Sequence, residues 1–293
     1  ANPYKFGLIG ASDTHTGAGS FDESNFFSKV GILDATPMMR GSLPLDAAAM
    51  ENAARNDLQG TLEVDGRRYL DNAFRTWRAS GLAGVWAETN TRDSIFSAFR
   101  RKETFATSGP RLQVRLFAGF SFENTLLEQP DWVEQAYASG VAMGGDLIGD
   151  RQQAPKLAMW AAQDALSAPL QRLQIIKGSF ENGELAETVY DAACADGLTV
   201  DPATHRCPDN GAEVDLATCE ISTGTGDAEL ATVWTDPDFD PSARAFYYVR
   251  VLENPTCRWS TWDAARAGVA PRADLQATLQ ERAWSSPIWY IPE

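Results

Sequence analysis

The feature that most constrains the fold is a series of short apolar segments in the second half of the chain. Clusters of Gly, Pro and Asp separate these segments. Segments of this length and spacing are typical of the strands of an all-β sandwich. We therefore expect a β-rich, sandwich-like module there. Its strand candidates are residues 156–162, 173–177, 188–190, 230–234 and 245–252.

The first half of the chain has a more mixed pattern. Residues 17–45 are polar and contain several Gly and Pro, which predicts a long irregular excursion of the kind that often carries function. The Ala-rich residues 45–56 predict a short helix, because Ala has the highest helix propensity. Residues 67–79 also fit a helix, with three apolar side chains on one face.

A strand followed by a helix is expected between residues 82 and 102. Residues 82–86 form a short apolar run, and Asn90 or Thr91 then provides a helix cap. Apolar residues recur along the following helix at helical spacing, which predicts a stripe buried against the core. The expected buried stripe consists of Ile95, Phe96 and Phe99.

Charge is distributed unevenly along the chain. Residues 1–120 hold 14 basic and 13 acidic side chains, whereas residues 121–293 hold 11 basic and 27 acidic ones. This asymmetry predicts two units with a border near residue 120. The net charge of −15 disfavours binding to nucleic acid or to an anionic membrane, because both need a basic surface. No apolar run is long enough to span a membrane.

Four cysteines lie in the acidic half, at positions 194, 207, 219 and 257. They form no Cys-x-x-Cys pair, which disfavours a zinc ribbon. Two disulfides have three possible connectivities, and four buried free thiols are the alternative. Residues 208–211 form a turn-rich loop, so we expect the pairs Cys207–Cys219 and Cys194–Cys257. Disulfides would place the protein in the periplasm or outside the cell.

The segment with the most evident chemistry is Asp-x-His at residues 13–15. The apolar run before it predicts a buried strand, and residues two apart in a strand point to the same side. Asp13 and His15 are therefore candidate metal ligands, because carboxylate oxygen and imidazole nitrogen serve hydrolytic metal sites. A hydrogen-bonded pair at a strand end is the alternative. The chain has only two histidines, so it cannot form a histidine-rich cluster alone.

Three further residues are candidates for the site. Glu88 follows the strand expected at 82–86, at the end where β/α barrels carry catalytic residues, and is a candidate catalytic group. The alternative is a carboxylate that interacts with a helix N-terminus. Arg92 and Arg111 are candidates for binding an anionic substrate, since Arg matches phosphate and carboxylate groups. Structural ion pairs are the alternative for both.

Three stretches together resemble a known family. They are GASDTHTG at 10–17, SGLAGVWAETNTRDSIFSAFRRKETFATSGPR at 80–111 and RAFYYVRVLENPTCRWSTWDA at 244–264. The chain resembles the C-terminal half of an uncharacterised family of secreted or periplasmic proteins in the PHP (polymerase and histidinol phosphatase) superfamily of metal-dependent hydrolases. The middle stretch is similar to the carbaryl-hydrolase-like branch, in which an Ala-Glu-x-x-Thr-Arg helix start precedes an Ala-Thr-x-Gly turn.

This resemblance implies an α/β fold with two parts. Residues 1–120 would form the C-terminal part of a distorted PHP-type β/α barrel with a long inserted loop at 17–75. Residues 121–293 would form the acidic β-rich module with its disulfides. PHP metal clusters combine an early His-x-His with a late Asp-x-His, and only the late motif is present, at Asp13 and His15.

The resemblance also implies the partner and the chemistry. The other ligands would come from the N-terminal half of the same polypeptide, and a start without Met or a signal peptide favours a piece of a longer protein. The complete site would hold two or three Zn, Mn or Fe ions. It would hydrolyse a small-molecule phosphoester or a carboxyl or carbamate ester. The alternative is a non-catalytic extracytoplasmic binding or assembly protein on the same scaffold.

Overall fold

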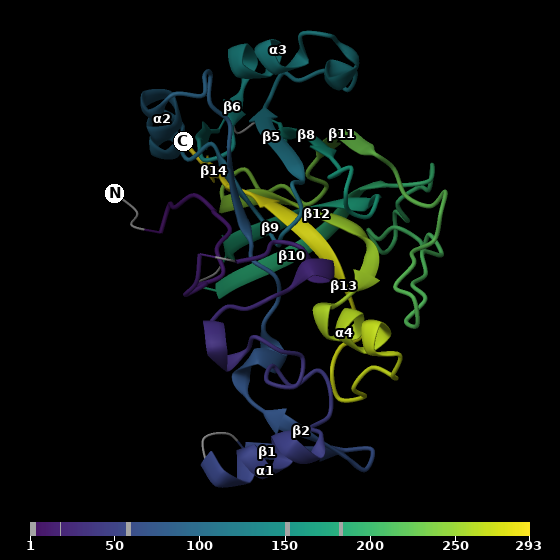
Figure 1. Cartoon of the computed structure of the whole chain (residues 1–293). Coiled ribbons are helices and arrows are strands. Elements are labelled where there is room, and N and C mark those ends of the chain that lie inside the picture. Colours follow the sequence, from purple (N-terminus) through teal and green to yellow (C-terminus); the bar gives the residue numbers. More distant parts are fainter. Residues whose placement is uncertain (1–3, 18, 57–59, 150–152, 182–183) are drawn as a thin grey trace.

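Two β-sheets packed face to face form the centre of the molecule (Figure 1). They are described here from a computed structural model, which covers residues 4–17, 19–56, 60–149, 153–181 and 184–293. In the large sheet, the main run of neighbouring strands is β10 (Glu184–Cys194), β9 (Leu170–Glu181), β12 (Arg244–Cys257), β13 (Thr278–Ser285), β4 (Thr104–Thr107) and β3 (Leu82–Val85). In addition, β14 (Ile288–Ile291) pairs with β12 and with β7 (Asp146–Ile148).

The small sheet lies on the other side of the core. Its strand order is β11 (Glu229–Thr235), β8 (Lys156–Ala162), β5 (Gln113–Gly119) and β6 (Val141–Ala142). The five strand segments predicted from the sequence correspond to β8, β9, β10, β11 and β12, so the β-rich prediction is confirmed. For β8 the predicted and observed bounds agree, and the other four strands are longer than predicted.

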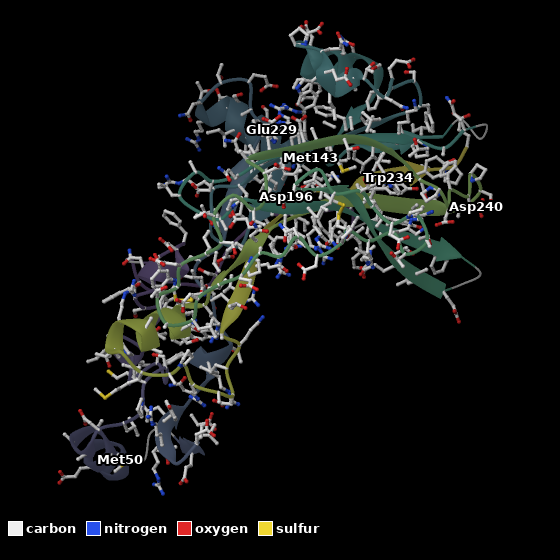
Figure 2. The ribbon with its side chains drawn as sticks, turned by 90° about the vertical axis from the view of Figure 1, so that its right-hand side faces the viewer. Met50, Met143, Asp196, Glu229, Trp234 and Asp240 are labelled. Atoms are coloured by element: carbon white, nitrogen blue, oxygen red, sulfur yellow. A yellow bond between two sulfur atoms is a disulfide. The ribbon has the colours of Figure 1, made fainter. Side chains whose placement is uncertain are left out.

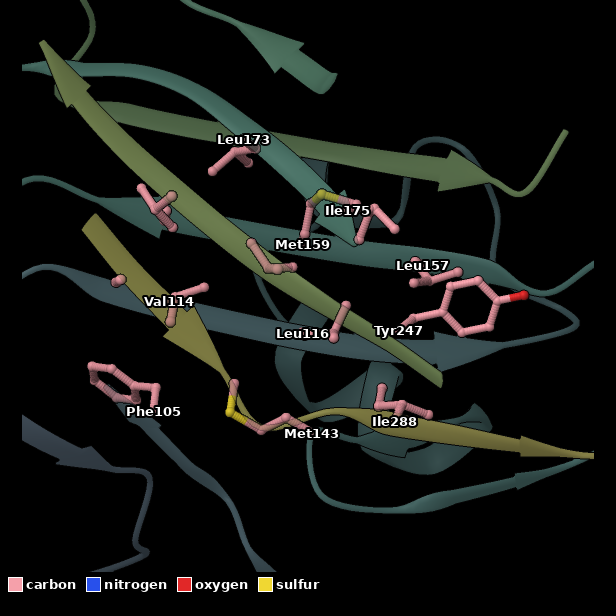
Figure 3. Close-up of a cluster of buried hydrophobic side chains, with 14 of the residues drawn as sticks. Phe105, Val114, Leu116, Met143, Leu157, Met159, Leu173, Ile175, Tyr247 and Ile288 are labelled. Carbon is pink, nitrogen blue, oxygen red and sulfur yellow. The ribbon is translucent and has the colours of Figure 1, made fainter. Parts of the chain in front are cut away.

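The core between the sheets is built by alternation along the strands. Leu116 and Met159 from the small sheet face Leu173 and Ile175 from the large sheet, and all four are fully buried (Figure 3). Each such side chain contributes about 1.5–3 kcal/mol of burial free energy. Because residues two apart in a strand share one face, the strands direct their intervening side chains away from this core.

The helices lie around the sandwich and away from it. Helix α2 (Arg92–Arg101) and helix α3 (Trp132–Ser139) are at one end, and α4 (Trp259–Ala267) follows β12. Helix α1 (Ala47–Asn56), which confirms the prediction at 45–56, lies with the hairpin of β1 (Gly60–Val64) and β2 (Arg67–Asp71) at the opposite end. Figure 2 shows Met50 of α1 far from Met143 and Trp234 of the sandwich. Single 3-10 turns occur at Glu23–Asn25, Gly31–Leu33, Ala73–Thr76 and Leu126–Glu128.

The predicted β/α barrel is not confirmed. The described residues form a mixed α/β structure of mostly strands, without a closed barrel. Strands β3 and β4 extend the large sheet, and β5 belongs to the small sheet. The border predicted near residue 120 therefore falls inside the sandwich, between β5 and α3, and the division into two units stays a prediction.

The helix predicted at residues 67–79 is wrong. Strand β2 and a 3-10 turn occupy this segment instead. The reason is the turn before it, where Asp65 and Gly66 have φ values of 49° and 71°. Two consecutive left-handed residues form the type of tight turn that joins antiparallel strands, and Val64 pairs directly with Arg67 across it.

Helix α2 begins as predicted, but its buried stripe is wrong. Thr91 is the cap, and its side chain accepts a hydrogen bond from the backbone N–H of Ser94. Phe96 is 64% exposed and Phe99 is 43% exposed, while Ala98 is fully buried. The apolar spacing indicated one face of a helix correctly, but no described element covers the two phenylalanines.

Buried charges hold the N-terminal excursion against α4. The guanidinium of Arg40 donates two hydrogen bonds to Asp263, at 2.8 and 2.6 Å, and both side chains are buried. Ser42 donates to the same carboxylate at 2.5 Å. Phe26 stacks on Trp259 with ring centroids 4.8 Å apart. The expected irregular excursion is therefore present in the described residues, and it is fixed at several points.

Both predicted disulfide pairs are wrong. The structure pairs Cys194 with Cys207 and Cys219 with Cys257. After β10 the chain turns back, and the N–H of Cys207 donates to the Asp191 carboxylate at 2.7 Å. This contact keeps Cys207 beside the end of β10, where Cys194 lies. The following turn carries the chain onward, so Cys219 reaches the end of β12.

Two disulfides are consistent with an oxidising, non-cytoplasmic compartment. None of the helices in the described part of the chain is long and apolar enough to cross a membrane.

We expect the two disulfides to differ in their contribution to stability. In the chain-entropy account, closing a loop of 38 residues contributes about 4 kcal/mol and a loop of 13 residues about 3 kcal/mol. The double variant C219S/C257S should therefore lose more unfolding free energy than C194S/C207S. Urea unfolding of both variants and of the parent chain measures this. A larger loss in C194S/C207S would contradict the loop-length argument.

Candidate functional site

The segment before Asp13 is extended but does not form the buried strand that the sequence predicts. It lies against β3 and β4, and it makes no strand ladder. A Cβ at Gly10 would lie 2.2 Å from the carbonyl oxygen of Leu82, and one at Gly7 would lie 2.9 Å from the Thr104 hydroxyl. Glycine is thus required for the close approach. Phe6 and Ile9 are 55% and 56% exposed.

Asp13 and His15 lie beside each other on the surface. The His15 Nε2 is 4.0 Å from the Asp13 Oδ1, and their side chains are 59% and 96% exposed respectively. Asp13 has φ of 53°, a left-handed conformation that Asp tolerates better than most residues. The two side chains are together because of this turn, and not because of strand alternation.

The backbone of the pair is held while its side chains face solvent. The His15 N–H donates to the carbonyl of Lys29 at 2.8 Å. The hydroxyls of Ser12 and Thr14 are 2.9 Å apart, and Thr14 is 3.1 Å from the hydroxyl of Ser80. This arrangement fixes where the two candidate ligands project.

The carboxylate and imidazole of the pair are donor types that suit a transition metal. Two ligands are too few for a complete metal site. One carboxylate and one imidazole are typical ligands of Zn, Mn or Fe, but catalytic zinc sites use three protein ligands. Among the described residues, no group of three or more His, Cys, Asp and Glu side chains could hold a metal ion. The pair alone therefore does not complete a metal site.

Glu88 is not near the pair. Ser80, which contacts Thr14, precedes β3, whereas Glu88 follows the other end of that strand. The Glu88 carboxylate accepts hydrogen bonds from Ser94 and Arg101, each at 2.9 Å. Hydrogen bonds from its own backbone N–H and from Ser94 lower the pKa of Glu88. This shift favours the ionised carboxylate, which suits the ion pair with Arg101.

Glu88 belongs to a cleft of about 750 Å³, which we name the Arg115 cleft. Arg115 lies over the ring of Trp86, with its guanidinium carbon 3.7 Å from the ring centroid. Val141, Ala142 and Met143 add an apolar side. Figure 1 shows the elements around it, α2, β5 and β6, at one end of the sandwich.

Hydrogen bonds fix the polar groups of the Arg115 cleft. Arg101 donates to Glu103 at 2.9 Å and also pairs with Glu88. The Tyr137 hydroxyl donates to Glu103 at 2.9 Å. Burial, and then the hydrogen bond to Glu103, raise the pKa of Tyr137, while Arg115 opposes this rise.

The two other predicted site residues lie elsewhere. Arg92 is exposed on the first turn of α2, and no described carboxylate forms an ion pair with it. Arg111 is also exposed, and its guanidinium carbon is 5.0 Å from the ring centroid of Phe21. Arg111 lines a second cleft, of about 520 Å³, which we name the Glu281 cleft. The structure thus separates Asp13 and His15 from Glu88, and Glu88 from Arg111.

Glu281 lines this cleft, and a second buried acid, Glu253, accepts a hydrogen bond from the cleft residue Ser167; the sequence indicated neither acid. Burial raises the pKa of Glu281 to about 7, against a hydrogen bond from Ser108 that lowers it. Burial also raises the pKa of Glu253 to about 8, and the negative charge of Glu281 adds to the rise. Among the described residues, the Oε1 of Glu253 is buried without a hydrogen-bond partner. Carboxyl groups with pKa values near neutrality often mark functional sites.

Sequence reasoning missed the residues of both clefts for one reason. Arg115 is an isolated basic residue in an apolar strand, and Glu253 and Glu281 lie in or beside apolar segments. A charged residue in an apolar strand is the sequence signal for such a site, because a buried charge must be paired or hydrogen-bonded. The residues that pair with the charged residue come from other helices and strands, so the neighbouring sequence does not identify them.

Comparison with known proteins gives a family and no relative of known activity. The model of a family described as protein of unknown function (DUF3604) matches residues 1–292. No curated protein and no solved structure was found to match the chain.

The two buried acids predict a pH dependence of stability. The unfolded chain releases their protons near the ordinary Glu pKa of 4.5, but the folded chain holds them to about 7 and 8. The free energy of unfolding should therefore fall as pH rises between about 5 and about 8. We expect E253Q/E281Q to remove most of the slope between pH 6 and 8 in urea unfolding.

The matched control is E128Q/E134Q, which changes two exposed carboxylates by the same chemistry. This control should keep the parent slope between pH 6 and 8. A parent chain with equal stability at pH 6 and pH 8 would contradict the assignment of the two acids.

Proposed function

The chain belongs to the family described as protein of unknown function (DUF3604). We propose that it carries part of the active site of a metal-dependent hydrolase. The enzyme would be of the PHP type, and its substrate a small-molecule phosphoester or a carboxyl or carbamate ester. The observation that carries the proposal is the Asp13–His15 pair, two exposed ligand-type side chains 4.0 Å apart on a fixed backbone.

The missing ligands are assigned to a segment outside these 293 residues, the N-terminal half of the same polypeptide. Apolar side chains left exposed on the segment that leads to the pair, and at Phe27, support this assignment, because exposed apolar side chains mark interaction surfaces. Tyr4, Phe6, Ile9 and Phe27 are each more than half exposed. A second segment packed here would cover them and bring its own histidines to the pair.

In the proposed enzyme, the residues of this chain bind and orient. The Asp13 carboxylate and the His15 imidazole would hold one edge of a cluster of two or three Zn, Mn or Fe ions. Such ions supply a Lewis acid and a water of lowered pKa when bound. Ser12 and Thr14 keep the turn in place through their hydroxyls. Glu88, Arg92 and Arg111 are left out of this proposal because the described structure shows no hydrogen bond or ion pair between them and the pair.

The two disulfides support an extracytoplasmic location, and we propose the periplasm or the extracellular space.

A second candidate function is a binding or assembly protein without catalysis. The exposed Phe96 and Phe99 of α2 favour it, since they add an apolar surface at the end of the molecule where α2 and α3 lie. In that case the Asp13–His15 pair would bind no metal. The metal experiment below therefore separates the two functions.

Binding of Mn²⁺ to the chain tests the proposal directly. The chain has only two histidines, so its proton NMR spectrum shows two sets of imidazole signals, which H15Q and H205Q assign. Paramagnetic Mn²⁺ should broaden the signals of His15 and leave those of His205 sharp. We expect D13N to raise the Mn²⁺ concentration needed for this broadening by about tenfold, because one carboxylate ligand is lost.

The control is D93N, which removes an exposed carboxylate from α2 and should change nothing. Equal broadening of both histidines, or an unchanged response in D13N, would refute the pair as a metal site and favour the binding or assembly protein.

A further inference from the structure

We propose that the Arg115 cleft binds the oxyanion group, carboxylate or phosphate, of a small organic molecule. This inference goes beyond the metal-dependent hydrolase and does not rest on it. It rests on three observations, namely an arginine without a carboxylate partner, rigid placement of that arginine, and an adjoining apolar side of the same cleft.

The first observation is the ion pairing in the cleft. Glu88 and Glu103 are its two carboxylates, and both are paired with Arg101, at 2.9 and 2.7 Å. Glu103 also accepts the Tyr137 hydroxyl. No described carboxylate lies within ion-pair distance of Arg115. Arg101 and Arg115 are the two arginines of the cleft, and Arg115 is the one without a carboxylate partner among the described residues. Tyr137 interacts with part of the Arg115 side chain, and the remaining donors are available to a ligand.

The second observation is the fixed position of Arg115. Its guanidinium carbon lies 3.7 Å from the ring centroid of Trp86, which is within cation–π distance and leaves room only for a stacked guanidinium. Trp86 is held in turn, because its Nε1 donates to the carbonyl of Val114 at 2.8 Å and its backbone N–H donates to the backbone carbonyl of Glu103 at 3.0 Å. A stacked guanidinium keeps its N–H donors at its edge, where they match the two oxygens of a carboxylate or phosphate.

The third observation is the composition of the rest of the cleft. Val141, Ala142 and Met143 line it with apolar groups, and Met143 is 3% exposed at the border of the core (Figures 2 and 3). A cleft of about 750 Å³ with few polar groups and one fixed charge is typical of small-molecule sites. The ligand therefore combines an oxyanion, for Arg115, with an apolar body, for the 141–143 side.

Titration of the 293-residue chain with simple probes tests the inference. The probes are benzoate, phenyl phosphate, inorganic phosphate and the neutral isostere benzamide, each in the presence of EDTA. Binding is followed by the indole N–H signal of Trp86 in ¹⁵N–¹H correlation spectra, assigned with W86F. We expect benzoate or phenyl phosphate to shift this signal with a Kd on the order of 1 mM. Benzamide should bind at least about tenfold more weakly.

Three variants assign the charge. R115Q should weaken benzoate or phenyl phosphate binding by at least about tenfold, and R115K should give an intermediate loss, since it keeps the charge without the planar donors. R100Q removes an exposed arginine of α2 outside the cleft and should bind as the parent does. Far-ultraviolet circular dichroism checks that each variant is folded.

Each outcome decides the inference. Equal binding of benzoate and benzamide would show an apolar cleft without oxyanion recognition, and would overturn it. So would binding that R100Q weakens as much as R115Q, or the absence of any Trp86 shift with all three anions. A shift with inorganic phosphate and with neither benzoate nor phenyl phosphate would overturn the inference that the ligand has an apolar body. Because EDTA is present and D13N should bind benzoate normally, failure of the metal site leaves this test intact.

Discussion

The buried carboxylate of Glu23 connects the parts of the molecule that surround the Asp13–His15 pair. Its two oxygens accept the backbone N–H groups of Ala79 and Trp259, at 2.6 and 2.7 Å. One side chain thereby joins the N-terminal excursion, the segment before β3 and the first turn of α4. An acceptor at a helix start is favourable, because the N–H groups there have no partner within the helix.

Burial disfavours the charged form of the Glu23 carboxylate, and hydrogen bonds oppose this effect. Burial raises its pKa, while the two backbone hydrogen bonds, and then the charge of Arg258, oppose the rise. Near this anchor, the Ser80 N–H donates to the carbonyl of Ser20 at 2.7 Å, and Ser80 contacts Thr14. The position of the candidate metal ligands is therefore determined by contacts with residues far away in the sequence.

The sequence predicted the structure where the signal was local. The bounds of β8 were predicted correctly, and the cap of α2 is Thr91, one of the two residues predicted for it, because both features follow from neighbouring residues. The disulfide pairing failed because it depends on where β10 and β12 end in space. The stripe of α2 failed because helical spacing indicates which side is apolar and cannot indicate what covers it. The Asp65-Gly66 turn was a local signal for a hairpin, and attention to it would have corrected the helix predicted at 67–79.

The candidate site shows the same division. Asp13 and His15 were identified from their spacing, and they do lie together, though a left-handed turn brings this about and not a strand. The Arg115 and Glu281 clefts were not identified, because each collects side chains from strands and helices distant in sequence. Arg111 and Glu88 were chosen for one site, and they occupy different clefts.

The two disulfides also determine how the chain would behave under tension. Each crosslink shields the residues between its cysteines from a pulling force, and the two loops, of 13 and 38 residues, do not overlap. At about 3.5 Å per extended residue, the disulfides prevent about 45 Å of chain in the shorter loop and about 130 Å in the longer loop from extending. The longer loop contains β11 and most of β12, one strand from each sheet. An oxidised molecule stretched from its ends therefore keeps a crosslinked remnant of its sandwich, which a reduced molecule would lose.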